Sequence, residues 1–288
     1  MRSIVYILLS VFIASILFTS IKGFTSEKRQ VISLQCVEKQ ISPDLLEQSA
    51  LIIKHRFETF GLNPVNVIVK EDKCKLLVDF TGNVKLETLR PLATLKGHIG
   101  FFEVYNNVDT ISLIKGDIKT IEGLNVSLKE NDLVPESEAI LGYCKGSDRL
   151  NIDSQLQNVL SHYPNKNIQF FWGSSANEKG FYNLFLLKKH AALEKSDILK
   201  SSVINNGAEI LIGFNESGKQ LWQSLTKNNI GNSIALVLDN RVYFAPIVKT
   251  EISNGSCLIS GDFSWNELKY LNSIISSKEL PLKFEVVD

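Results

Sequence analysis

The chain has 288 residues, of which 44% are hydrophobic, so it can bury the core of one large domain or two small ones. Its 31 lysine and arginine residues balance 31 aspartate and glutamate residues, which argues against nucleic acid as a partner because such a partner requires a basic excess. The same balance gives no support to a general affinity for anionic lipids or acidic substrates.

An uncharged apolar run, Ile4–Ile21, follows Arg2. As a helix, its about 18 residues would extend roughly 27 Å, enough to cross the hydrocarbon core of a membrane. A cleaved secretory signal has a shorter apolar core and a small-x-small cleavage site, and Ile21-Lys22-Gly23 is a poor site. We therefore predict an uncleaved transmembrane anchor in residues 1–24, with cleavage and release as the alternative. In both cases the rest of the chain is exported.

The next stretch has the spacing of two helices among four strands. Ser42 as N-cap and Pro43 at the first helical position start a helix that Gly61 ends. A second helix is predicted over Leu86–Leu95. The strands are predicted at Val31–Val37, Asn66–Lys70, Lys75–Phe80 and Ile99–Val104. The resulting order, β-α-β-β-α-β, is that of a ferredoxin-like sheet.

Polar turns and short apolar runs alternate between Asn106 and Asp197, where the pattern is weaker. Asp153–His162 is predicted as a helix, and Ile168–Trp172 and Tyr182–Leu187 are predicted as strands.

The last third has the clearest pattern. A strand, Glu209–Phe214, leads into a helix that places Trp222 on its apolar face and that Asn228–Gly231 breaks. Ile234–Leu238 and Val242–Phe244 form a hairpin across the tight turn Asp239-Asn240-Arg241. Three further elements are predicted, a strand at Cys257–Ile259, a helix at Ser264–Ile275 and a strand at Leu282–Val287.

No stretch has a catalytic or metal-binding pattern. The four cysteines include no C-x-x-C pair and the four histidines are scattered, so we expect neither a metal nor a cofactor. Gly173-Ser174-Ser175 and Gly255-Ser256-Cys257 are not G-x-S-x-G elbows, and no base is placed to serve them. Asp239 is expected to bond backbone N–H groups of its hairpin, as aspartate does in turns. We therefore expect no catalytic residue.

Three aromatic side chains are candidates for the surface or the core. Trp222 is expected in the core. Tyr243 and Phe244 are neighbours on a strand and point to opposite faces, so one of them points outward. We treat this pair as a candidate contact for a polypeptide.

The order of motifs in the last third resembles a known family. F-N-x-x-G is followed by T-x-x-N-x-G, by A-x-V-L-D closing on A-P, and by G-x-x-x-I-x-G-x-F. This pattern is similar to that of the SecD subunit of the bacterial Sec export machinery, in its first large periplasmic domain. The matching residues are Phe214, Asn215, Gly218, Thr226, Asn229, Gly231, Ala235, Val237, Leu238, Asp239, Ala245, Pro246, Gly255, Ile259, Gly261 and Phe263.

Two positions depart from the family pattern. Asn240 stands where the family usually has glycine, and asparagine also tolerates positive φ. Phe244 stands where the family usually has serine, which puts a bulky apolar group in place of a small one. The fold should tolerate both changes, whereas a surface that a partner recognises is more sensitive to them.

The resemblance implies an α+β fold with a ferredoxin-like base and an inserted head. The base would comprise residues 31–105 and 262–288, and the α+β head residues 106–261. In such a base the first and third strands are antiparallel neighbours, which makes Cys36 and Cys74, both at core-facing strand ends, a candidate disulfide.

The resemblance also implies a function. The chain would be an accessory of protein export, attached to the inner membrane by a single helix with its bulk in the periplasm, that contacts translocating polypeptides or Sec translocase subunits. The family couples this work to a proton gradient through charged residues in several membrane helices, whereas Ile4–Ile21 has none, so we expect no motor of its own. The alternatives are a diverged envelope scaffold and an unrecognised envelope enzyme.

Overall fold

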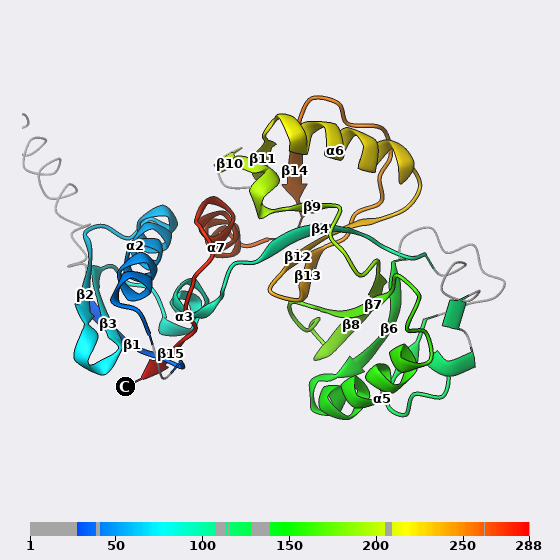
Figure 1. Ribbon diagram of the computed structural model, residues 1–288, viewed down its shortest axis with the longest axis horizontal. Helices are drawn as coiled ribbons and strands as arrows, with labels where there is room; N and C mark the ends of the chain where they lie inside the picture. The colour runs from blue at the N-terminus through cyan, green and yellow to red at the C-terminus, as the bar shows by residue number, and fades with distance from the viewer. Residues whose placement is uncertain are drawn as a thin grey trace, which may run out of the picture.

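Figure 1 shows the computed structural model of the chain, which describes residues 28–38, 41–106, 113–114, 116–127, 139–204, 209–261 and 263–287. The fold is mixed α+β, as predicted, and its strands form three sheets. The predicted anchor, Ile4–Ile21, lies outside the described residues. Within the described ranges, no helix combines the length and the apolar character needed to cross a membrane.

The first sheet has four antiparallel strands in the order β15-β1-β3-β2. Its strands are β1 (Arg29–Cys36), β2 (Val65–Lys70), β3 (Lys75–Thr81) and β15 (Phe284–Val287). Its helices are α2 (Pro43–Phe60), α3 (Leu86–Thr94) and α7 (Trp265–Ser276), and the short helix η1 (Glu71–Lys73) joins β2 to β3. Alternate residues of β1 and β3 are buried against the helices, as a sheet with one covered face requires.

The sequence signals at the ends of α2 are confirmed. Ser42 is the N-cap and Pro43 occupies the first turn, although the Ser42 hydroxyl makes no capping hydrogen bond. Gly61 ends the helix with φ 104°, in the left-handed region where glycine is favoured.

The predicted strand Ile99–Val104 forms, as β4 (Ile99–Glu103), but its expected place in the first sheet is wrong. It pairs with β12 (Ile234–Leu238) and β9 (Leu193–Glu194) in another sheet, and β15 lies beside β1 instead. Four successive residues of β4 are buried, so the strand needs cover on both faces, which an edge strand of the first sheet would not receive.

The second sheet has eight strands in the order β5-β6-β8-β7-β13-β12-β4-β9. Their bounds are β5 (Asn125–Val126), β6 (Ile140–Lys145), β7 (Gln169–Gly173), β8 (Phe181–Leu187), β9 (Leu193–Glu194), β12 (Ile234–Leu238) and β13 (Arg241–Phe244). Among the strands of this sheet that the structure describes, β7 and β13 pair in parallel and the other neighbours pair antiparallel. The helix α5 (Arg149–Ser161), which follows the short helix η2 (Gly146–Asp148), buries Ile152, Leu156 and Val159 in a core that includes Trp172.

The hairpin of β12 and β13 turns through Asp239 and Asn240, with φ of 46° and 63°. Positive φ at both residues defines the type I′ turn that matches the twist of the two strands. Asn240 therefore takes the backbone conformation for which glycine is usual.

The third sheet has the order β10-β11-β14, from strands β10 (Ile198–Ile204), β11 (Glu209–Phe214) and β14 (Ser256–Ser260). The short helix η3 (Lys195–Asp197) precedes β10, and α6 (Glu216–Asn228) follows β11. Asn215 caps α6, because its side-chain oxygen accepts a hydrogen bond from the Gly218 N–H at 2.8 Å. In Figure 1 this sheet lies beside α7 and above β4, so β4 runs beneath it on the way from the first sheet to the second.

Candidate functional site

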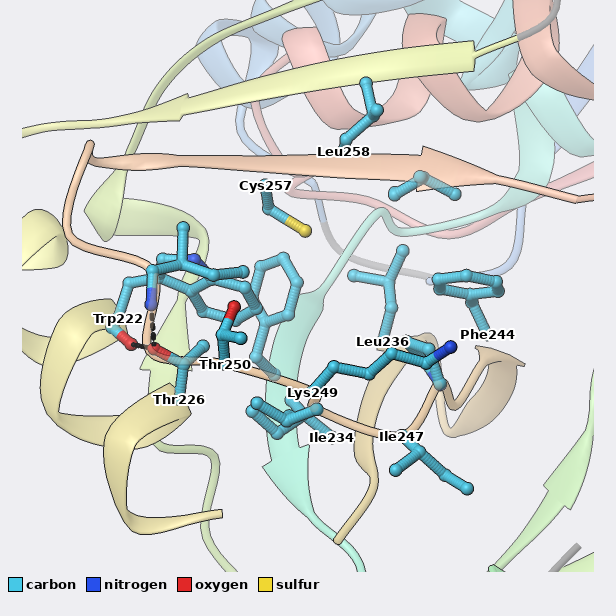
Figure 2. Close-up of a pocket in the computed structure, with 15 residues that line it drawn as sticks. Trp222, Thr226, Ile234, Leu236, Phe244, Ile247, Lys249, Thr250, Cys257 and Leu258 are labelled. Atoms are coloured by element: carbon cyan, nitrogen blue, oxygen red, sulfur yellow. Dashed lines mark hydrogen bonds between the residues drawn. The ribbon is translucent and has the colours of Figure 1, made fainter. Parts of the chain in front are cut away.

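An apolar cavity of about 250 Å³ lies between the third sheet and strands β4 and β12. Its walls come from β4, α6, β12, β14 and residues 244–252 (Figure 2). The volume is below the roughly 300–1,000 Å³ of sites for drug-sized molecules, so it suits a few side chains better than a cofactor. Among the described residues, no three His, Cys, Asp or Glu side chains gather to hold a metal.

Aromatic side chains form the floor of the cavity. Trp222 is 4% exposed, and its ring lies 5.1 Å from that of Phe101 and 5.3 Å from that of Phe214, in edge-on and tilted geometries. Trp222 is thus in the core, as predicted. Its Nε1–H is buried and has no hydrogen-bond partner among the described residues, which is unusual for a buried donor.

The T-x-x-N-x-G motif attaches α6 to the segment that closes the cavity. The Thr226 hydroxyl accepts a hydrogen bond from the Ile252 N–H at 3.0 Å and donates one to the Trp222 carbonyl at 2.9 Å. The Asn229 side chain donates to the Leu225 carbonyl at 2.9 Å, and the Gly231 N–H donates to the Val248 carbonyl at 2.8 Å. These motif residues therefore build a wall of the cavity.

Steric constraints explain why glycine occupies two of the motif positions. A Cβ atom on Gly218 would lie 2.6 Å from the Asp197 carbonyl oxygen, and Gly255 has φ 73° beside the Lys219 side chain. Gly255 also accepts the hydrogen bond from the Phe214 N–H at 3.0 Å that starts the pairing of β11 with β14. Of the remaining predicted residues, Pro246 is exposed on the rim of the cavity, and Ala245 and Gly261 flank Phe244 and Phe263.

The two aromatic residues predicted to contact a polypeptide separate, as alternation on a strand requires. Phe244 is half-buried and lines the cavity, with its ring 6.2 Å from that of Phe263. Tyr243 points the other way, and its hydroxyl lies 2.9 Å from that of Tyr270. Burial raises the pKa of the Tyr243 phenol above its usual range. Of the pair, only Phe244 lies at the cavity.

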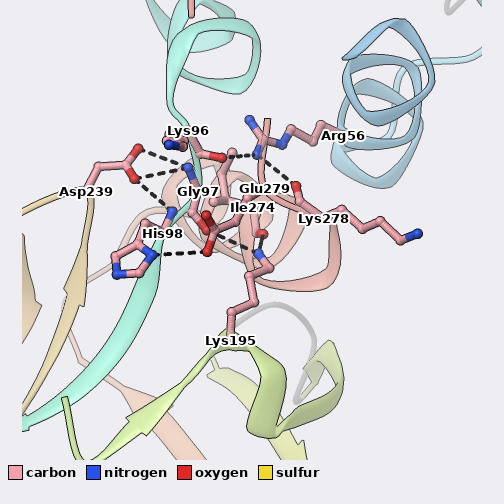
Figure 3. Close-up of polar contacts among 9 residues, drawn as sticks. All are labelled: Arg56, Lys96, Gly97, His98, Lys195, Asp239, Ile274, Lys278 and Glu279. Atoms are coloured by element: carbon pink, nitrogen blue, oxygen red, sulfur yellow. Dashed lines mark hydrogen bonds and ion pairs between the residues drawn. The ribbon is translucent and has the colours of Figure 1, made fainter. Parts of the chain in front are cut away.

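Asp239 bonds to the connection between α3 and β4, and not to its own hairpin as predicted. Its carboxylate accepts hydrogen bonds from the Gly97 N–H, at 3.0 and 3.1 Å, and from the His98 N–H at 2.8 Å (Figure 3). The type I′ turn closes through its backbone, which leaves the carboxylate available for these two donors. Asp239 therefore attaches the second sheet to the helical layer of the first.

Arg56 on α2 is fully buried at the same junction. Its guanidinium donates to the Ser277 hydroxyl at 2.8 Å and to four carbonyls, those of Leu92, Leu95, Lys96 and Lys278, at 2.6 to 3.2 Å. Burial lowers the pKa of Arg56 to about 10, opposed in part by the charge of Asp239. Figure 3 shows Arg56 reaching from α2 toward the ends of α3 and α7.

Lys195 approaches the junction from the opposite side. Its ammonium donates to the Ile274 carbonyl at 2.6 Å, in the last turn of α7, where a cation is favoured by the helix dipole. Burial and the charge of Arg56 lower the pKa of Lys195 to about 8. Sequence analysis missed both cations. Arg56 could have been found, because it falls on the buried stripe of α2 between Ile53 and Phe60.

Cys36 and Cys74 lie side by side on neighbouring segments. The Cys36 N–H donates to the Cys74 carbonyl at 3.0 Å, and both side chains pack against the core of the first sheet. Both thiols are free in the structure. Burial raises the pKa of Cys36 to about 11, which keeps the sulfur in the less reactive thiol form.

Comparison with known proteins found similarity to the SecD family in the part of the chain that supplies most of the cavity lining. Residues 174–282, which contain α6, β12, β13 and β14, match the family model of the SecDF P1 head subdomain. The chain is 25% identical over 272 residues to the protein translocase subunit SecD of Calditerrivibrio nitroreducens, an alignment that covers 92% of this chain and 44% of that protein. It is 36% identical over 90 residues to SecD of Acidaminococcus fermentans, covering 31% of this chain and 22% of that one.

The fold agrees with these sequence matches. A crystal structure of SecDF in the super-membrane-facing form superposes with a TM-score of 0.56 at 18% identity, covering 98% of this chain and 34% of that one. The chain spans less than half the length of the SecD proteins it matches. The resemblance inferred from the motifs is confirmed: the chain is SecD-like over most of its length, and its residues 174–282 match the SecDF P1 head subdomain.

Proposed function

We propose that this protein assists protein export by holding apolar segments of exported polypeptides in the cavity that Phe244 and Trp222 line. The similarity to SecD supports a role in protein translocation. The single observation that carries the finer proposal is the cavity itself, which is apolar, smaller than typical sites for drug-sized molecules and, apart from Phe101, lined by residues within the range 174–282 that matches the SecDF P1 head subdomain. An apolar cavity retains apolar side chains that water would otherwise surround.

The proposed architecture follows from the sheet order. The four-stranded sheet with α2, α3 and α7 would be a ferredoxin-like base, since β15-β1-β3-β2 is the strand order of that fold. The expected ranges of this base, 31–105 and 262–288, also include β4, which pairs in the second sheet instead. β4 would then carry the chain into a head of residues 106–261. Ile4–Ile21 would anchor the protein in the inner membrane, with its bulk in the periplasm and Sec translocase subunits as neighbours.

The test is site-specific photocrosslinking in intact cells. A benzoylphenylalanine at position 244 reports on the cavity, and the same residue at position 150 is the matched control, because Leu150 is 83% exposed on α5, outside the cavity. We expect adducts with newly made exported chains at 244 and few at 150. Equal yields at both positions, or adducts that contain no exported chain, would favour the scaffold alternative. An envelope enzyme would need a convergent polar site, and the cavity lining does not provide one.

A further inference from the structure

Within the part of the chain that the structure describes, the strand β14 forms one edge of the third sheet, with no strand paired to its outer side. The Phe214 N–H donates to the Gly255 carbonyl at 3.0 Å, so these two residues form a hydrogen-bonded antiparallel pair. Two residues further along the register, Cys257 is bonded to Ile212 in the same way. The residue between these positions along β14, Leu258, therefore points its N–H and carbonyl away from β11, toward the free edge.

This free edge borders the cavity. The cavity lining includes Cys257, Leu258 and Ile259, and the side chain of Leu258 is 46% exposed. Figure 2 shows Cys257 and Leu258 on opposite faces of β14. The strand has the sequence SCLIS. It contains neither a charged residue nor a proline, and these are the residues that usually protect an edge strand from further pairing.

Two comparisons single out this edge. The opposite edge of the sheet, β10, carries Lys200 and packs against α7, so it is both charged and covered. Beside β14, in contrast, lies the apolar cavity, whose lining includes Cys257, Leu258 and Ile259 of this strand. An extended polypeptide supplies the backbone donors and acceptors that pair with the outward groups of β14.

We propose that an exported polypeptide adds to the free edge of β14 as an extended strand, with alternate apolar side chains entering the cavity. This inference rests on the proposed function and specifies how the polypeptide is held. Strand addition takes its affinity from the backbone and reads only every second side chain, so it accepts many sequences. The occupant is thereby an unfolded segment, because a folded chain has its backbone groups already paired.

The direct test uses N-methylated peptides and the full-length protein. A short fluorescein-labelled peptide with leucine at alternate positions and serine between them is titrated by fluorescence anisotropy. Methyl groups are placed either on the leucine nitrogens or on the serine nitrogens. In an antiparallel addition the leucines enter the cavity and the serine N–H groups face β14, so serine methylation should weaken binding by about tenfold or more while leucine methylation is tolerated. The reverse asymmetry would show parallel addition.

A variant pair tests the same edge from the protein side. Leu258→Pro removes the outward N–H without removing a bond to β11, and Leu258→Val keeps that N–H as the matched control. We expect Leu258→Pro to bind about tenfold more weakly than Leu258→Val at a similar Tm. If Leu258→Pro unfolds, the methylated peptides still decide the question with the natural protein.

Equal weakening by both methylation patterns, or by neither, would refute strand addition while leaving capture in the cavity intact. Absence of any peptide binding, together with no crosslinking at position 244, would instead refute the proposed function itself. Self-association that Leu258→Pro abolishes, measured by light scattering, would assign the edge to a second copy of the chain and overturn the proposal.

Discussion

The replacement of Arg56 by methionine tests the junction between the sheets. The change keeps a long apolar stem but removes the guanidinium, which leaves four carbonyls and the Ser277 hydroxyl without their donor. A buried acceptor that loses its partner costs about 1–3 kcal/mol, so the five acceptors together, of which the Leu92 carbonyl and the Ser277 hydroxyl are fully buried, should cost about 3–5 kcal/mol.

We therefore expect Arg56→Met to lower the free energy of unfolding by about 3–5 kcal/mol, a large share of the about 5–15 kcal/mol of a typical domain. The corresponding fall in Tm is roughly 10 °C for a protein of this size. Urea unfolding followed by far-ultraviolet circular dichroism measures both the midpoint and the slope. Arg90→Ala, an exposed arginine on α3, is the control and should change the free energy by no more than about 0.5 kcal/mol.

A loss below about 1 kcal/mol in Arg56→Met would refute this reasoning, because it would mean that the carbonyls find water or other donors once the guanidinium is gone. A changed slope of the urea transition would point to an altered unfolded or native state instead of a lost set of hydrogen bonds.

Four further outcomes are expected. Asp239→Ala should cost about 0.5–2 kcal/mol, from its lost hydrogen bonds, and leave crosslinking from the cavity largely intact. Phe244→Ser should reduce capture of exported chains while Tm changes little, and unchanged capture would contradict a contact at this ring. Burial lowers the pKa of Lys195 from 10.5 to about 8, so the unfolded state binds more protons between these values. Stability should therefore rise as pH increases from 8 to 10.5 and be constant with respect to this group below 8, and Lys195→Met should lack this slope. Under prolonged oxidation by a disulfide reagent, peptide mapping should find Cys36 joined to Cys74, and a bridge to any other cysteine would contradict their adjacency.

Local patterns predicted most elements, because hydrophobic spacing and turn residues act within a few positions. The ends of α2 and the tight turn at Asp239-Asn240 depend on neighbouring residues, and both are present. Membership of a sheet depends on the whole chain instead. The spacing of Ile99–Val104 predicted a strand correctly, but only its burial on both faces shows why it lies in the eight-stranded sheet.

The candidate site was predictable in part for the same reason. The T-x-x-N-x-G motif identified Thr226 and Gly231, yet nothing in the sequence showed that they hold Ile252 and Val248 at the cavity. Alternation indicated that Tyr243 and Phe244 point to opposite faces without deciding which one reaches a partner. Cys36 and Cys74 were correctly expected as neighbours because the pairing of the first and third strands follows from the strand order.

The pairing of β1 with β15 has a consequence for how the protein is made. Leu34 lies opposite Val286, so β1 receives one of its two neighbours only when Phe284–Val287 are available. During synthesis from the amino terminus, β1, β2 and β3 form an incomplete sheet until those residues have been made, and contacts between such distant residues slow folding. Completion of this sheet therefore depends on Phe284–Val287, and deletion of these four residues would leave β1 as an open edge.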